Sequence, residues 1–260
     1  MIKMNQPYKV IYTVIIVFLI AMMGCATSPR KQERADAYLN VGIAYLGAER
    51  YNEALKELLE AEKLNSRDPK IHHYIGISYY GKELNDRAIG EFKKAIALKP
   101  DYSEAHNFLG TVYLEMGFWD NALESFKNAL SNILYETPDK ALFNMGRAYH
   151  GKGDYEKALS TYQDAKNKKP NTVPPPLIDH YMGITYFAQG NLEKAVQYLK
   201  TSLKEAPFLV ESHYWLGQCY IKLNEREKAK AEFQAVIKIT PESKLGIAAR
   251  KSLDSIGSLR

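Results

Sequence analysis

The chain has 260 residues, of which a quarter are charged, and its 35 basic and 30 acidic residues leave a net charge of +5. This basic excess is too small and too evenly spread to indicate a nucleic-acid-binding protein. There are only two cysteines, Cys25 and Cys219, so the disulfide framework of a small secreted domain is excluded.

Residues 1–24 are predicted to be a lipoprotein signal peptide. Two lysines and no acid precede an apolar run over residues 10–23, which is shorter than the roughly 20 residues of a membrane-spanning helix. Gly24 and Cys25 follow, and this stretch resembles a bacterial lipobox, in which the cysteine is lipidated and becomes the mature N-terminus. An ordinary signal cleaved nearby and a retained anchor are the alternatives.

Residues 25–34 are small and polar and are interpreted as a lipidated tether. Eight such residues extend over at most about 26 Å, so the rest of the chain is expected to stay close to the membrane. Because Ala26 and not aspartate follows Cys25, the chain resembles lipoproteins that are sorted to the outer membrane. We therefore expect a protein that is anchored there by lipid and faces the periplasm.

Residues 35–241 contain six copies of one pattern, spaced by 34 to 37 residues. Each copy has a glycine, a tyrosine three residues later, an alanine twelve later and a leucine or aromatic residue sixteen later. The glycines are Gly42, Gly76, Gly110, Gly146, Gly183 and Gly217. Apolar residues recur at helical spacing on both sides of a short break, which predicts a pair of antiparallel helices. Glycine and alanine allow the two helices to cross closely, and a pair this short must stack on its neighbours to bury its apolar face.

This pattern resembles the tetratricopeptide repeat. The resemblance implies an all-α, right-handed α-solenoid of six helix pairs, and residues 242–260 are expected to form a capping helix that frays from Ser255 onward. The period is interrupted at residues 131–139 and at residues 171–176. The second interruption, NTVPPP, is interpreted as a stiff spacer between repeats, with a recognition site for another protein as the alternative.

No set of residues predicts catalysis, a cofactor or a metal site. His72, His106 and His213 share one repeat position, which repeat stacking explains, and no carboxylate or cysteine joins them at ligand spacing. The stretch from Gly146 to Gly153 imitates a phosphate-binding loop, but it lacks the serine or threonine after the lysine and follows no strand. The chain is therefore expected to be neither an enzyme nor a binder of small-molecule substrates.

A protein-binding groove is the remaining expectation. In tetratricopeptide arrays the concave groove is lined by the first helix of each pair, and the resemblance places there Leu39, Ile43, Leu46, His73, Ile77, Tyr80, Asn107, Thr111, Leu114, Phe143, Arg147, His150, Leu177, His180, Ile184, Phe187, Tyr214, Gln218 and Ile221. Such an apolar lining is typical of a binding site and does not suit the clamp for a C-terminal carboxylate. The alternative is that a tight superhelix or the last helix covers it.

The signal, the tether, the six repeats and the long junction ALSNILYETPDKALFNMGRAY, with Asn144 and Gly146, together resemble the PilF/PilW lipoproteins of type IV pilus biogenesis. The resemblance implies a pilotin, which carries the secretin to the outer membrane and assists its assembly. The implied partner is the secretin, bound through the first repeats. An envelope adaptor of the NlpI type, which holds proteases or peptidoglycan enzymes to their substrates, is the alternative function.

Overall fold

The computed structural model describes residues 28–258, and every regular element in this part of the chain is an α-helix. The predicted signal peptide, Cys25 and the first residues of the tether lie outside the described residues. No helix within residues 28–258 is long and apolar enough to span a membrane. The chain divides into two compact units, residues 1–99 and residues 100–260.

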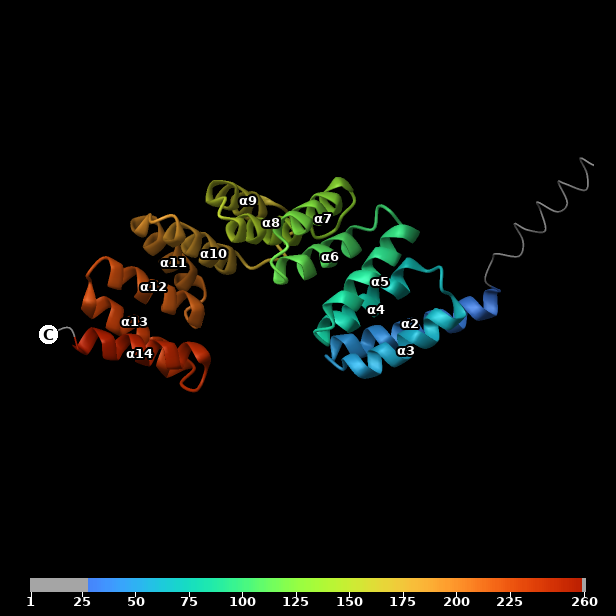
Figure 1. Ribbon diagram of the computed structural model, residues 1–260, viewed down its shortest axis with the longest axis horizontal. Helices are drawn as coiled ribbons and strands as arrows, with labels where there is room; N and C mark the ends of the chain where they lie inside the picture. The colour runs from blue at the N-terminus through green and yellow to red at the C-terminus, as the bar shows by residue number, and fades with distance from the viewer. Residues whose placement is uncertain (1–27, 259–260) are drawn as a thin grey trace, which may run out of the picture. The chain divides into compact units, whose positions relative to one another are not determined.

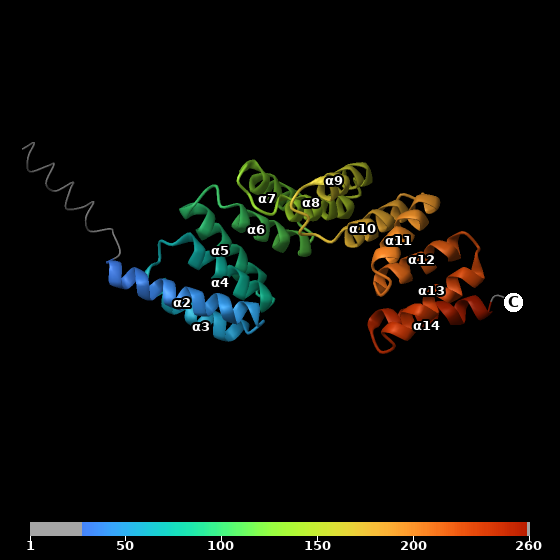
Figure 2. The same cartoon turned by 180° about the vertical axis from the view of Figure 1, so that it is seen from behind.

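The first unit consists of two antiparallel helix pairs (Figures 1 and 2). Their helices are α2 (Pro29–Gly47), α3 (Tyr51–Leu64), α4 (Pro69–Gly81) and α5 (Asn85–Leu98). Helix α2 begins at Pro29, which is preorganised for a first turn, so residues 29–34 of the expected tether are helical. Helix α4 is capped by Asp68, whose carboxylate accepts a hydrogen bond from the backbone N–H of Lys70 at 2.8 Å.

The second unit contains four helix pairs and a last single helix. The pairs are α6 (Ser103–Glu115) with α7 (Trp119–Ser131), α8 (Pro138–Lys152) with α9 (Tyr155–Asn167), α10 (Pro175–Ala188) with α11 (Leu192–Glu205), and α12 (Val210–Lys222) with α13 (Arg226–Ile239). Helix α14 (Lys244–Ser258) packs on α13 and α12, as expected of a capping helix, and remains helical beyond Ser255.

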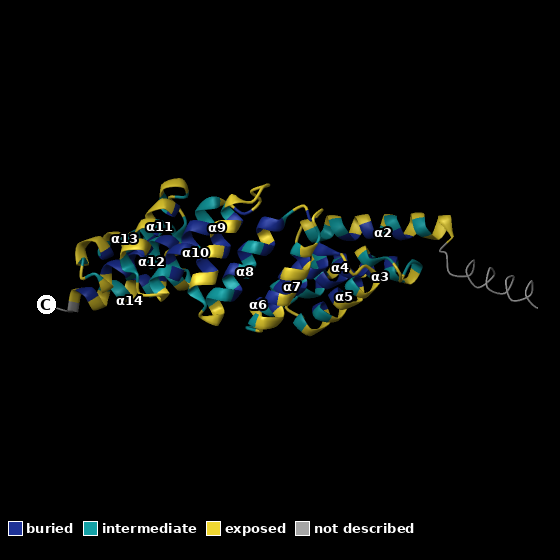
Figure 3. Cartoon of the chain, turned by 90° about the horizontal axis from the view of Figure 1, so that it is seen from above, coloured by how far each residue is buried: buried dark blue, intermediate teal, exposed yellow. Residues whose placement is uncertain are grey.

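The two helices of each pair cross at the predicted glycine. A methyl group on Gly76 would lie 2.7 Å from the ring of Phe92, and one on Gly110 would lie 2.6 Å from the ring of Phe126. Both rings are fully buried, so they have no open space into which to move. Figure 3 shows that burial concentrates on the facing sides of the helices. The predicted all-α solenoid of six helix pairs with a cap is therefore confirmed.

Cys219 is part of the core of the last repeat. Its side chain is fully buried in a cluster that includes Leu216 and Phe233, and burial raises the pKa of its thiol to about 12. A thiol that stays protonated and inaccessible is a packing residue and not a nucleophile.

Candidate partner-binding surface

The first helices of successive pairs form the inner side of each unit. In the first unit the backbones of α2 and α4 come close together, whereas those of α3 and α5 do not. In the second unit α6, α8, α10, α12 and α14 contact one another in succession, whereas the described second helices α7, α9, α11 and α13 do not. Elements that approach more closely lie on the inside of a curved stack, so the side chains between the first helices line the concave face.

In the first unit this face is mostly apolar. Ile43 and Leu46 pack against the core that contains Leu39 and Ile75, yet both remain partly exposed. Ile77 and Tyr80 follow on α4 and are also half-buried. Burying the remaining apolar area of each side chain against a partner would stabilise a complex.

The predicted lining residues divide into three groups. Those that the structure buries in the stack are Leu39, His73, Asn107, Leu114, Phe143 and His180. Those that stay partly accessible are Ile43, Leu46, Ile77, Tyr80, Thr111, Arg147, His150, Leu177, Ile184, Phe187, Tyr214 and Gln218. Ile221 is the most exposed, at 39%. Only the last two groups can contact a partner, because the first group is already covered by neighbouring helices.

In the second unit the inner face carries hydrogen bonds between successive repeats. Asn144 donates to the hydroxyl of Thr111 at 3.3 Å, and the Nδ1 atom of His150 lies 2.9 Å from the hydroxyl of Thr185. Further along the stack, His180 Nδ1 lies 2.9 Å from the Ser212 hydroxyl. These polar groups therefore already have partners within the stack.

Arg147 lies on α8, on the inner face of the second unit. Its guanidinium donates to Asn144 at 3.1 Å and lies 5.5 Å from the ring centroid of Tyr181 and 6.0 Å from that of Phe143. Both distances fall in the range of cation–π attraction. This half-buried cation gives the inner face of the second unit a positive charge that the apolar face of the first unit lacks.

Comparisons with known proteins identify the repeat. Family models described as tetratricopeptide repeat match residues 39–103, 101–167 and 186–251. The matches leave out residues 168–185, where the proline-rich interruption lies. This chain belongs to the tetratricopeptide-repeat family.

Two solved structures and one curated relative resemble the chain. A structure titled as the functional characterisation of Pseudomonas aeruginosa PilF is 17% identical, with a TM-score of 0.71, and the alignment covers 85% of this chain and 99% of that one. PilW, titled a widely conserved type IV pilus biogenesis factor, is 19% identical, with a TM-score of 0.76 and coverage of 83% and 98%. Human protein O-mannosyl-transferase TMTC2 is 29% identical over 100 residues, which are 38% of this chain and 12% of that protein.

The two interruptions of the tetratricopeptide period are joined through a buried aspartate. Asp139, in the first turn of α8, is fully buried and accepts hydrogen bonds from the backbone N–H groups of Thr172 and Val173 at 2.5 and 2.8 Å. The hydroxyl of Thr172 also donates to this carboxylate at 2.8 Å. The loop before α10 is thus fixed to the start of α8, and Pro175 and Pro176 then enter the first turn of α10.

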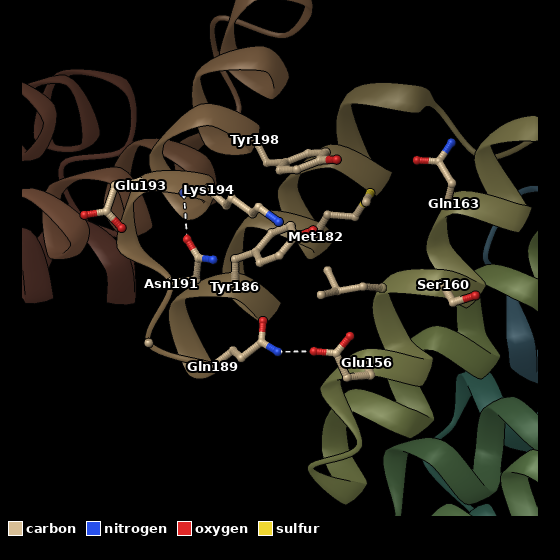
Figure 4. Close-up of a pocket in the computed structure, with 12 residues that line it drawn as sticks. Glu156, Ser160, Gln163, Met182, Tyr186, Gln189, Asn191, Glu193, Lys194 and Tyr198 are labelled. Atoms are coloured by element: carbon tan, nitrogen blue, oxygen red, sulfur yellow. Dashed lines mark hydrogen bonds between the residues drawn. The ribbon is translucent and has the colours of Figure 1, made fainter.

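An open cleft of about 750 Å³ lies between the fourth and fifth tetratricopeptide repeats (Figure 4). Tyr186 and Tyr198 stack at 5.3 Å on its α10–α11 side, and the amide of Gln189 donates to Glu156 across from α9. The ammonium of Lys194 lies 5.2 Å from the ring centroid of Tyr186. Several of these lining side chains bind one another, and the lining holds no nucleophile paired with a base.

His72 is the centre of a cluster that sequence reasoning did not find. Its Nδ1 atom lies 2.8 Å from Glu91 and 3.8 Å from Glu62, and its Nε2–H donates to the backbone carbonyl of Ser66 at 2.9 Å. The hydrogen bond to Glu91 raises the pKa of His72, and the Ser66 carbonyl adds to this effect. The sequence shows no carboxylate at ligand spacing from this histidine, yet the fold brings Glu62 and Glu91 to it from two other helices, at sequence separations that form no local motif.

Proposed function

We propose that this chain is a non-catalytic protein-binding scaffold, and that the inner face of the first unit holds an apolar segment of its partner. The observation that carries the proposal is the row Ile43, Leu46, Ile77 and Tyr80, whose side chains are half-buried on adjacent first helices. Tetratricopeptide solenoids present concave surfaces for binding, and apolar side chains in such a surface favour an apolar ligand.

We further propose that the partner is the secretin of a type IV pilus and that the chain acts as its pilotin. The likeness to PilF and PilW, each of which is covered almost completely, supports this choice. The resemblance of the stretch before Cys25 to a lipobox supports an outer-membrane anchor, which would place the scaffold where secretin subunits assemble. No cofactor or small-molecule substrate is needed for this function.

The test is the amount of heat-resistant secretin multimer in outer membranes from cells with and without this gene. The proposal predicts that multimers disappear without the gene while the secretin monomer persists. Unchanged multimers would contradict the pilotin function, and association with cell-wall hydrolases would then favour an adaptor of the NlpI type.

The binding face is tested by a matched pair of double variants. Ile77→Asp with Tyr80→Ala places a charge on the first unit's face and removes an aromatic ring, so partner binding and multimer formation should be lost. Ile184→Asp with Phe187→Ala makes the same changes at the equivalent positions of the fifth repeat and should leave binding intact. Circular dichroism checks that both variants remain helical, and equal binding by the two would refute the placement on the first unit.

A further inference from the structure

Glu62, His72 and Glu91 bring three metal-ligating side chains together from three helices of the first unit. Glu62 lies on α3, His72 on α4 and Glu91 on α5, and one donor atom from each lies within 4.8 Å of the other two. The imidazole is 5% exposed, Glu91 is 13% exposed and Glu62 is 29% exposed. The cluster is thus buried on the side of the imidazole and open on the side of Glu62, which gives an ion a path of entry.

The repeat framework accounts for two of these three residues. In the sixth repeat His213 lies 2.6 Å from Glu232, and its Nε2–H donates to the backbone carbonyl of Pro207 at 3.0 Å. These contacts repeat those of His72 with Glu91 and Ser66 at equivalent positions. The position that corresponds to Glu62 is occupied by Leu203. The histidine, one carboxylate and the backbone carbonyl are therefore sufficient for these contacts. Glu62 is a further carboxylate that the contacts shared by the second and sixth repeats do not require.

The donor set of the second repeat suits a zinc ion. Zinc is bound in proteins by imidazole nitrogen and carboxylate oxygen, and sites with three protein ligands keep a fourth position for water. The Nε2–H of His72 donates to a backbone carbonyl, which is the usual way in which a ligating imidazole is oriented. Lys94 binds the other oxygen of Glu91 at 2.7 Å, so that Oε2 remains directed at the cluster.

We propose that Glu62, His72 and Glu91 bind one zinc ion through the Nδ1 atom of His72 and one oxygen of each carboxylate. Glu62 belongs to the first repeat, and His72 and Glu91 belong to the second. The ion therefore links the two repeats of the first unit and stabilises their stacking. This inference is independent of the identity of the partner protein.

The test is calorimetric titration of the full chain with zinc chloride. Wild type should bind one zinc ion at this cluster, and Glu62→Leu, which copies the sixth repeat, should lower the affinity at least tenfold, as should His72→Gln. Glu60→Leu is the matched control, because it removes the same charge from the same helix while only the surface pair with Lys63 is lost. It should bind zinc as wild type does.

A second readout is the thermal unfolding temperature with and without zinc. Zinc should raise this temperature for wild type and Glu60→Leu but not for Glu62→Leu, since an ion that binds only the folded chain stabilises it. Absence of zinc binding by folded wild type would overturn the proposal. Equal affinity and equal thermal shifts for wild type and Glu62→Leu would overturn it as well, because a bound ion would then lie elsewhere.

Discussion

The inner faces of the two units are built on the same repeat but differ in chemistry. In the first unit the accessible positions hold Ile43, Leu46 and Ile77, whereas in the second the corresponding row includes Thr111 and Arg147. Polar side chains of the second unit bind a neighbouring repeat of the stack, as Asn144 does with Thr111. The difference teaches that polar residues on a concave face need not indicate a polar ligand, because they can serve the stacking of repeats.

The junctions between repeats differ in the same way. In the first unit the two helix pairs are joined by a short connection between α3 and α4. In the second unit the loop before α10 folds back onto α8 and is held by Asp139. A buried carboxylate with three hydrogen bonds is stable only while all its partners are present. The second unit therefore depends on specific polar contacts at this junction.

Replacing Asp139 by alanine is expected to have the largest effect on stability. The change leaves the N–H groups of Thr172 and Val173 without their acceptor, and that of Val173 is buried, so we expect a loss of about 3 kcal/mol in the free energy of unfolding. Trp119 and Trp215 both lie in the second unit, so urea unfolding followed by tryptophan fluorescence reports on this unit.

The control for this variant is Glu136→Ala, which removes an exposed carboxylate from the same junction and should change stability by less than about 0.5 kcal/mol. If both variants unfold at the wild-type urea concentration, Asp139 does not fix the loop, and the two junctions are not energetically coupled.

Acid should destabilise the first unit through His73. Burial lowers the pKa of His73 to about 3, so the folded chain keeps the imidazole neutral while the unfolded chain protonates it below about pH 6.5. The stability that depends on the neutral form is complete above pH 6.5 and is lost as the pH falls toward 3. The slope is at most about 1.4 kcal/mol per pH unit, or about 2 kcal/mol between pH 6.5 and pH 5.

The measurement is urea unfolding by circular dichroism at pH 6.5 and pH 5, for wild type and His73→Leu. The variant should lose about 2 kcal/mol less than wild type over this interval, since it carries no imidazole at this position. His213 has the opposite pH dependence. Its pKa is raised, chiefly by its hydrogen bond to Glu232, so its contribution to stability is present below pH 6.5 and is lost as the pH rises above that value. The same pH dependence in wild type and His73→Leu would show that His73 is not buried as a neutral group.

The sequence was sufficient to predict the helix pairs and their crossing points. The spacing of sixteen residues between Gly76 and Phe92 identifies a contact that the structure places at the crossing of α4 and α5. Such predictions succeed because the repeat is local, and each pair contains both partners of its main contact. The capping helix was predictable because its own apolar residues recur at helical spacing.

The polar contacts could not be predicted in this way. Asp139 has the position of an ordinary acidic residue at a helix start, and only the fold of the chain brings Thr172 to it from 33 residues away. Glu62 and Glu91 lie 10 residues before and 19 residues after His72, which matches no metal-ligand motif of one helix or loop. Hydrogen bonds between repeats depend on how the helix pairs stack, and the spacing of residues along the sequence does not reveal that geometry.

The smallest effect on the free energy of unfolding is predicted at one repeat position that occurs in both units. Ser78 and Thr185 both follow the crossing glycine by two residues and are both fully buried. The hydroxyl of Ser78 donates to the carbonyl of Tyr74 in its own helix, whereas that of Thr185 donates to Tyr181 and also lies 2.9 Å from His150 Nδ1. Because the hydroxyl hydrogen of Thr185 is already used, its oxygen accepts from His150.

Thr185→Val should therefore cost about 1 kcal/mol, since it keeps the shape of the side chain but leaves the imidazole N–H of His150 without its acceptor. Ser78→Ala should change the free energy of unfolding by less than about 0.5 kcal/mol, because the Tyr74 carbonyl keeps its place in the helix and alanine is the better helix former. Tryptophan fluorescence reports the first variant, and circular dichroism, which includes the first unit, reports the second. An equal loss of unfolding free energy in the two variants would mean that the hydrogen bond between His150 and Thr185 does not stabilise the stacking of the repeats. The polar side chains of the second unit's inner face would then be available to a ligand.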